Sequence, residues 1–337
     1  MRCGAHYMQM KMTEPARLNV LNAGLMLVSC AAAFALPFHL FLFAYAVLGP
    51  LHYLTEISWL HDRGYFASRG RGRNWWLGLV AVTVGVLLLG YATEAPPQYE
   101  IGFVYLVFFS ALMLHYVRHT ASAVALIALT AGGIALASSS PTYFLIAYLL
   151  VTIIHVFVFT ALFVMHGALR TRSWSGIASL AVMIACAAAF FVVTPAAAAP
   201  STSIRAVYDF FAPLNQQLLR LFGYTTRDVF ASRGGAAVMR FIAFSYTYHY
   251  LNWFSKTSII KWHEVPKART VVIVALWLTA IGIYAYSYEL GFVVLYFLSV
   301  LHVMLEFPLN HQSFVGIGRE LRGLLTPAGR ESAAARS

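Results

Sequence analysis

Long apolar runs separated by short polar segments make up most of the chain. Ten of these runs approach the ~20 apolar residues that a helix needs to cross a bilayer. They lie near residues 19–36, 40–60, 75–91, 101–118, 120–138, 142–168, 174–194, 237–254, 270–287 and 290–306. Pro50 falls inside the second run, where its missing N–H is expected to kink the helix. The pattern predicts an all-α integral membrane bundle of about ten transmembrane helices, formed as one domain by residues 1–325.

Two segments differ from these runs. Residues 195–235 are too polar to span a bilayer, yet their apolar side chains recur at helical spacing. The recurring residues are Ile204, Val207, Phe210, Phe211, Leu214, Leu218 and Leu221. This spacing predicts a non-spanning segment that is partly an amphipathic helix on the membrane interface. Residues 326–337 are predicted to form a disordered tail.

The composition agrees with a membrane protein. Of the 337 residues, 60% are hydrophobic and 10% are charged, whereas about 25% of the residues of a soluble domain are charged. The net charge of +11 comes from Lys and Arg residues in short loops, where they act as topology signals toward anionic lipid and do not indicate a nucleic-acid partner. Three cysteines without CxxC spacing support neither a disulfide framework nor a thiolate metal site.

The basic residues alternate along the chain. They precede the first apolar run and follow each even-numbered run, while the loops at 37–39, 92–100, 139–141 and 288–289 contain no Lys or Arg. The positive-inside rule therefore predicts that both termini face the cytoplasm, in an inner or plasma membrane. The segment 195–235 departs from the rule, because it falls on the outer side and still carries Arg205, Arg220, Arg227 and Arg233. Its side of the membrane stays open.

Histidines follow the same alternation. Ten of the twelve lie on or just after the even-numbered runs: His52, His61, His115, His119, His155, His166, His249, His263, His302 and His311. These runs all end at the predicted cytoplasmic face, so the histidines are expected to share one site there. An unpartnered polar side chain in hydrocarbon is costly, which makes a shared polar function the expected reason for their presence.

Three pairs have the spacing at which two helical side chains point the same way: His52 with Glu56, His115 with His119, and His302 with Glu306. Imidazole and carboxylate groups together suit iron, zinc, copper or manganese. The predicted metal ligands are His52, Glu56, His115, His119, His155, His249, His302 and Glu306. A second group of ligands or of partners that orient the ligands comprises His61, His166, His263, His311, Asn252, Asn310 and Glu264. Solvation at the interface and packing are the alternative roles for these side chains.

The histidine pattern resembles the site of the membrane-bound di-iron desaturases and hydroxylases. Those enzymes hold iron with histidine boxes at the cytoplasmic ends of their helices, and His115-Tyr116-Val117-Arg118-His119 matches one HxxxH box. The resemblance implies non-haem iron, as one or two ions, that activates dioxygen, with another transition metal as the alternative. It also implies a lipophilic substrate taken from the bilayer and an electron-donor protein. No HxxHH box occurs, and ten spans exceed the number in that family.

A second, local resemblance is to the membrane-bound O-acyltransferases. Asn252-Trp253, Lys261-Trp262-His263 and the late helical His302 resemble the asparagine and histidine motifs of that family. The resemblance implies that His302 acts as a general base, and it assigns no role to the other buried histidines. A haem-binding electron carrier, with histidines as axial pairs, and a scaffold or transporter remain further alternatives.

Overall fold

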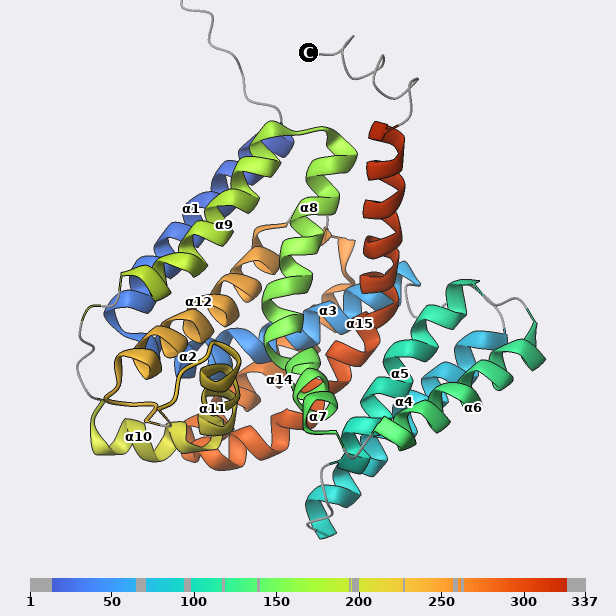
Figure 1. The fold of residues 1–337 in the computed structure, drawn as a ribbon, viewed down its shortest axis with the longest axis horizontal. Coiled ribbons are helices and arrows are strands. Elements are labelled where there is room, and N and C mark those ends of the chain that lie inside the picture. The colour runs from blue at the N-terminus through green and yellow to red at the C-terminus, as the bar shows by residue number, and fades with distance from the viewer. Residues whose placement is uncertain are drawn as a thin grey trace, which may run out of the picture.

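A computed structural model of the chain describes residues 14–64, 71–93, 98–116, 119–137, 140–193, 195, 200–226, 228–256, 260–261 and 264–325. All regular elements in these residues are helices (Figure 1). In chain order they are α1 (Glu14–Ala35), α2 (Pro37–Phe43), η1 (Ala44–Leu48), α3 (Gly49–Arg63), α4 (Arg71–Thr93), α5 (Gln98–Tyr116), α6 (Thr120–Ala137), α7 (Pro141–Leu149), η2 (Leu150–Phe159), α8 (Thr160–Thr171), α9 (Trp174–Val192), α10 (Thr202–Tyr208), η3 (Asp209–Phe211), α11 (Ala212–Leu221), α12 (Arg233–Ser255), α14 (Lys267–Tyr286) and α15 (Tyr288–Leu325).

Among the described residues, seven helical segments are long and apolar enough to cross a membrane. They are Pro15–Ala35, Pro37–Arg63, Trp76–Thr93, Leu150–Thr171, Trp174–Val192, Lys267–Tyr286 and Tyr288–Leu325. The other three predicted runs coincide with α5, α6 and α12. The all-helical, multi-pass prediction is therefore confirmed, while the count of ten spans stays a prediction. The predicted disordered tail lies outside the described residues.

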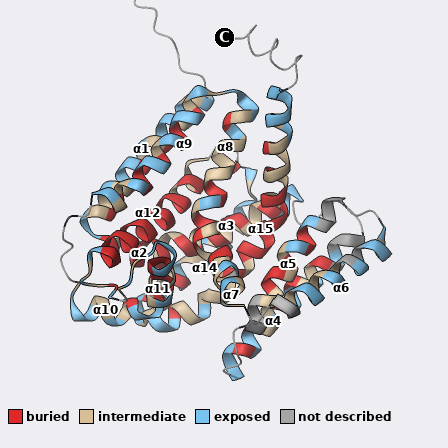
Figure 2. Ribbon diagram, in the orientation of Figure 1, coloured by how far each residue is buried: buried red, intermediate tan, exposed pale blue. Residues whose placement is uncertain are grey.

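Helix α12 lies at the centre of the bundle. Every residue from Gly234 to Tyr250 is buried, and the helix packs against α1, α2 and α9. Figure 2 shows the contrast with α1 and α9, whose outer faces are exposed. A helix that faces protein on all sides does not need the apolar surface of a lipid-facing span. This explains why α12 can carry the buried Arg240, whose Nη1 donates to the carbonyl of Pro195 at 3.0 Å.

Polar contacts fix α12 against the first helix. The Oδ1 atom of Asn22 on α1 accepts hydrogen bonds from Tyr248 Oη at 3.3 Å, Asn252 Nδ2 at 2.8 Å and Ser255 Oγ at 3.2 Å. Interhelical hydrogen bonds of this kind contribute to helix association in a bilayer, where apolar contact alone provides no driving force over lipid. The contacts define how α12 is positioned relative to α1.

Two clusters of buried apolar side chains meet at α3 and η2. The first cluster extends over α1, α2, α9, α11 and α12, and the second over α4, α5 and α15. Helix α3 contributes Tyr53 to the first and Leu60 to the second, while η2 contributes Ile153 and Phe159 in the same way. The predicted polar residues of α3 and η2 therefore lie between the two clusters.

The two ends of the bundle differ. The start of α1 and the ends of α8 and α15 lie at the top of Figure 1, and α10 and α11 lie at the bottom. The non-spanning segment forms α10, η3 and α11, of 7, 3 and 10 residues, which are too short to cross a bilayer. Helix α15 has 38 residues and is about 57 Å long at 1.5 Å per residue, so it extends beyond a ~30 Å hydrocarbon core.

Candidate metal centre

Four histidines from four different helices form a closed ring of imidazoles. They are His52 on α3, His155 on η2, His249 on α12 and His302 on α15. The ring centroids are 4.7 Å apart for His52 and His249, 4.9 Å for His249 and His155, 5.2 Å for His155 and His302, and 5.3 Å for His302 and His52. No member is more than 7% exposed. Residues separated by up to 250 positions in the sequence thus meet in one buried site.

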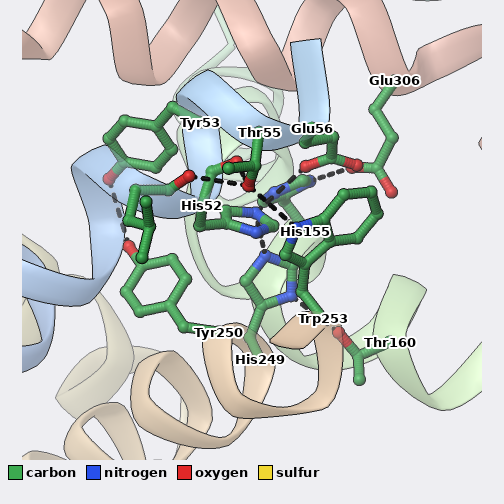
Figure 3. A network of polar contacts seen from close by, with 11 residues as sticks. His52, Tyr53, Thr55, Glu56, His155, Thr160, His249, Tyr250, Trp253 and Glu306 are labelled. Carbon is green, nitrogen blue, oxygen red and sulfur yellow. Dashed lines mark hydrogen bonds and ion pairs between the residues drawn. The ribbon is translucent and has the colours of Figure 1, made fainter. Parts of the chain in front are cut away.

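Two carboxylates flank this ring. Glu56 Oε2 is 3.0 Å from His52 Nε2, and Glu306 Oε2 is 3.1 Å from His155 Nδ1; both glutamates are 2% exposed. In Figure 3 the two carboxylates lie on one side of the imidazoles, while Tyr53 and Tyr250 lie on the other. Glu56 contacts the histidine one turn before it on α3, as its spacing predicts. Glu306, by contrast, contacts a histidine of another helix.

Two stretches of π-helix position the ring. His155 is in the middle of η2, and η1 ends immediately before the first turn of α3, where Pro50 precedes His52 by two residues. Pro50 has no N–H to bond within the helix, and the wider π turn before it accommodates the proline. A π turn also changes the direction in which later side chains point, which is why such turns are frequent at functional sites. A π-helical turn thus precedes Pro50, and the kink itself stays a prediction.

Hydrogen bonds and ring contacts orient three of the imidazoles. Thr160 Oγ1 is 2.8 Å from His249 Nδ1, so that the other nitrogen, Nε2, faces His52 Nε2 at 3.0 Å. The ring of Tyr53 stacks on His302 with centroids 4.3 Å apart. Trp253 packs edge-on against His52 at 5.6 Å. Partners of this kind fix the tautomer and direction of metal-binding histidines.

The donor atoms fit a metal ion. Ligand atoms of His52, His155 and His249 lie within 4.8 Å of one another, as do those of His52, Glu56 and His302. Two ligands of one ion at metal–nitrogen distances of about 2.1 Å are roughly 3.3 Å apart, close to the observed separation of the His52 and His249 nitrogens. Among the described residues, His52 Nδ1, His155 Nε2 and His302 Nε2 have no hydrogen-bond partner. Such buried polar atoms are costly without a partner.

One cation lies near the two carboxylates. Lys256 directly follows α12 and is half-buried, with its Nζ 6.0 Å from the centroid of the Phe163 ring. Burial lowers the pKa of the Lys256 ammonium to about 8, and the carboxyls of Glu306 and Glu56 act in the opposite direction. Neither glutamate forms an ion pair with Lys or Arg within the described part of the chain. Within the described residues, their only ion-pair partners are therefore imidazoles.

The other predicted residues lie elsewhere. His61 and His119 are exposed, and His166 is half-buried. His311 is buried, with Nε2 2.8 Å from the carbonyl oxygen of Phe108. The side chain of His115, although the residue belongs to α5, and the whole of His263 lie outside the described residues.

The three predicted polar partners also have separate surroundings. Asn252 donates to Asn22 and Tyr248, and the exposed Glu264 pairs with Lys261 at 2.6 Å. Asn310 is buried one turn after Glu306, and neither its Oδ1 nor its Nδ2 has a hydrogen-bond partner among the described residues. Of the predicted set, the structure therefore brings together His52, Glu56, His155, His249, His302 and Glu306.

Sequence reasoning did not predict the role of Thr160. It is five residues after His155 on the same continuous helix, but it contacts the histidine of α12, 89 positions away. No spacing rule within one helix indicates such a contact. Comparison of the chain with protein-family models, curated proteins and solved structures finds no match in any of the three.

Proposed function

We propose that this chain is a membrane-embedded, metal-dependent oxidoreductase that acts on a lipophilic substrate. The observation that carries the proposal is the buried set of four imidazoles and two carboxylates with unpartnered donor atoms. His52, Glu56, His155, His249, His302 and Glu306 would hold the metal. The structure offers two candidate ligand groups, His52 with His155 and His249, and His52 with Glu56 and His302. Because His52 belongs to both, the site could hold one ion or two neighbouring ions.

Iron is the metal we favour, because mixed imidazole and carboxylate ligands without thiolate are typical of non-haem oxygenases. When bound, iron would activate dioxygen, and with two electrons and two protons from a donor protein it would hydroxylate or desaturate a carbon chain and release water. The protein groups have separate tasks: Thr160 and Tyr53 orient imidazoles, while the surrounding apolar helices exclude water from the site. We place the site toward the cytoplasmic side of an inner or plasma membrane, from the basic loops.

The test is metal content measured together with activity. Wild-type protein purified without chelators is analysed for iron, zinc, copper and manganese, beside His155→Ala, His249→Ala and His302→Ala. Several ligands hold the ion together, so each variant is expected to lower the amount of bound metal at least about tenfold. Loss of a residue that only orients a ligand already weakens metal binding by about 10–100-fold.

Matched controls come from histidines outside the ring. His39→Ala and His119→Ala change exposed imidazoles, and the metal content of both is expected to equal that of the wild type. His115→Ala tests its predicted ligand role in the same series. Wild-type protein that contains none of the four metals would refute the proposal, and a loss of activity only in His302→Ala would then favour general-base acyl transfer.

A further inference from the structure

A cavity of about 230 Å³ extends from the imidazole ring toward the non-spanning segment. His155, His249 and His302 line one end, and Phe210, Phe211 and Leu214 of η3 and α11 line the other. Figure 1 shows α11 on the side of the bundle opposite to the ends of α8 and α15. The cavity therefore leads from the proposed metal site toward the end of the bundle that holds α10 and α11.

The cavity wall contains no charged group. Among the 21 described lining residues, nine are Tyr or Phe, and none is Asp, Glu, Lys or Arg. The hydroxyls of Tyr53 and Tyr250 are 3.1 Å apart and bond to each other. An ionised carboxylate or phosphate placed among these aromatic side chains would have no Lys or Arg to pair with, which is costly in an apolar environment. An uncharged molecule avoids that penalty.

Aromatic side chains form the end of the cavity farthest from the histidines. Phe211 contacts the rings of Phe41, Tyr45 and Phe292 with centroids 4.8, 4.9 and 5.1 Å apart. Phe210 stacks on Phe292 at 5.9 Å and is 39% exposed. Phe210 and Phe292 thus place partly exposed aromatic rings on the cavity wall beside the non-spanning segment.

We propose that this cavity binds an uncharged, elongated apolar molecule, which reaches the imidazole ring from the α10–α11 side. The inference rests on the proposed function, since it assigns the substrate class of the same site. The extent of the lining supports it: the lining residues come from η1, α3, α4, α5, α7, η2, η3, α11, α12 and α15. On α15 they extend from Phe292 to Val303, about three helical turns. A hydrocarbon or terpenoid chain without an ionised head group has the matching chemistry.

The test uses a matched pair of photoreactive probes in lipid nanodiscs. One is an alkyne-tagged hexadecane that carries a diazirine at mid-chain, and the other is the corresponding hexadecanoate. Labelling is read by mass spectrometry at Tyr246 and Tyr250, which line the cavity and are 7% and 1% exposed. We expect the uncharged probe to label both residues at least about tenfold more than hexadecanoate does, equivalent to ~1.4 kcal/mol of binding preference.

Substitution pairs on two helices provide the controls. Val300→Phe fills the cavity, whereas Val294→Phe makes the same change on the exposed face of α15. Thr152→Phe and Val158→Phe are the equivalent pair on η2, should the first filling variant fail to fold. Only the cavity-filling member of a pair is expected to lose labelling at Tyr246 and Tyr250. Equal labelling by hexadecanoate, or equal losses in both members of a pair, would overturn the inference.

The same preparations separate the two proposals, because labelling requires neither metal nor turnover. Metal-free wild-type protein that is labelled at Tyr246 would refute the metal centre and support the cavity assignment. Metal-containing protein that is labelled by neither probe would refute the cavity assignment and leave the metal centre standing.

Discussion

At the scale of single residues, His249 differs from the other three imidazoles because one of its ring nitrogens has a hydroxyl partner. When His249 Nδ1–H donates to Thr160 Oγ1, the lone pair is on Nε2, which faces His52 at 3.0 Å. The remaining three rings depend on packing and on the carboxylates for their direction. A substitution of Thr160 therefore changes the orientation of His249 without removing a metal ligand.

We predict that Thr160→Val weakens metal binding by about 10–100-fold, because the isosteric change removes the partner that selects the His249 tautomer. Thr160→Ser keeps the hydroxyl and should restore binding. The protein is first freed of metal with a chelator and then titrated with iron(II), and the bound iron is measured by metal analysis. A role in packing alone would give the opposite order, with Val closer to wild type than Ser.

The glutamates provide a second residue-scale prediction. Glu306→Gln keeps the shape of the side chain and removes its charge, so bound metal should fall at least about tenfold. Loss of a buried carboxylate without a Lys or Arg partner should not destabilise the metal-free protein, since such groups are costly to bury. Metal per protein and the melting temperature after chelation are the two readouts. Glu264→Gln, at an exposed carboxylate, is the control, and metal retained by Glu306→Gln would count against ligation.

At the scale of helices, much of the site could be predicted from spacing within one helix. His52 with Glu56 and His302 with Glu306 are i,i+4 pairs, and His155 and His249 are notable because they lie deep in apolar runs. The same rule selected His119, yet α5 ends at Tyr116 and the exposed His119 lies directly before α6, so it does not share a helix with His115. The π-helical form of η2 and the contact of Thr160 with His249 depend on packing between helices. The spacing of residues within one helix does not predict either feature.

A glycine at the start of α3 allows a close approach between helices. A Cβ atom at Gly49 would lie 2.9 Å from Tyr53 Oη and 3.2 Å from Tyr250 Oη. Gly49→Ala should therefore separate the two tyrosines and destabilise the protein by about 1–3 kcal/mol through overpacking. Gly24→Ala in α1 is the control, because nothing lies within 4 Å of its added Cβ and alanine favours a helix. Thermal unfolding in detergent compares the two, and an unchanged melting temperature for Gly49→Ala would contradict the packing argument.

At the scale of the whole molecule, the bundle has two chemically different ends. Basic residues such as Arg172 and Arg322 follow or end the helices α8 and α15, and both helix ends lie on the side where α1 starts. The segment with α10 and α11 lies at the other end, although it carries Arg205 and Arg220. Part of that positive charge has local partners, since Arg205 Nε donates to Pro200 and its guanidinium lies over Phe230 at 5.3 Å.

We therefore predict that a topology reporter inserted after Arg172 reads cytoplasmic and that one inserted after Gly223 reads external, despite the arginines between residues 195 and 235. The physical reason is that α9, which lies between the two positions, is long and apolar enough to cross the bilayer. A reporter after Gln98 should agree with Gly223. If Arg172 and Gly223 report the same side, α9 does not cross, and the assignment of the imidazole ring to the cytoplasmic half loses its basis.

The position of Asn22 has a consequence for the order of biosynthesis. Its Oδ1 atom receives its donors from Tyr248, Asn252 and Ser255, which are 226 to 233 residues later in the chain. At translation rates of about 5–20 residues per second, the Asn22 side chain would wait roughly 10–50 seconds in the membrane before its donors on α12 are made. Nascent chains stalled before Tyr248 should therefore crosslink from Asn22 to insertion machinery, and chains stalled after α15 should not. The first helix would then acquire the polar partners of Asn22 only when α12 arrives.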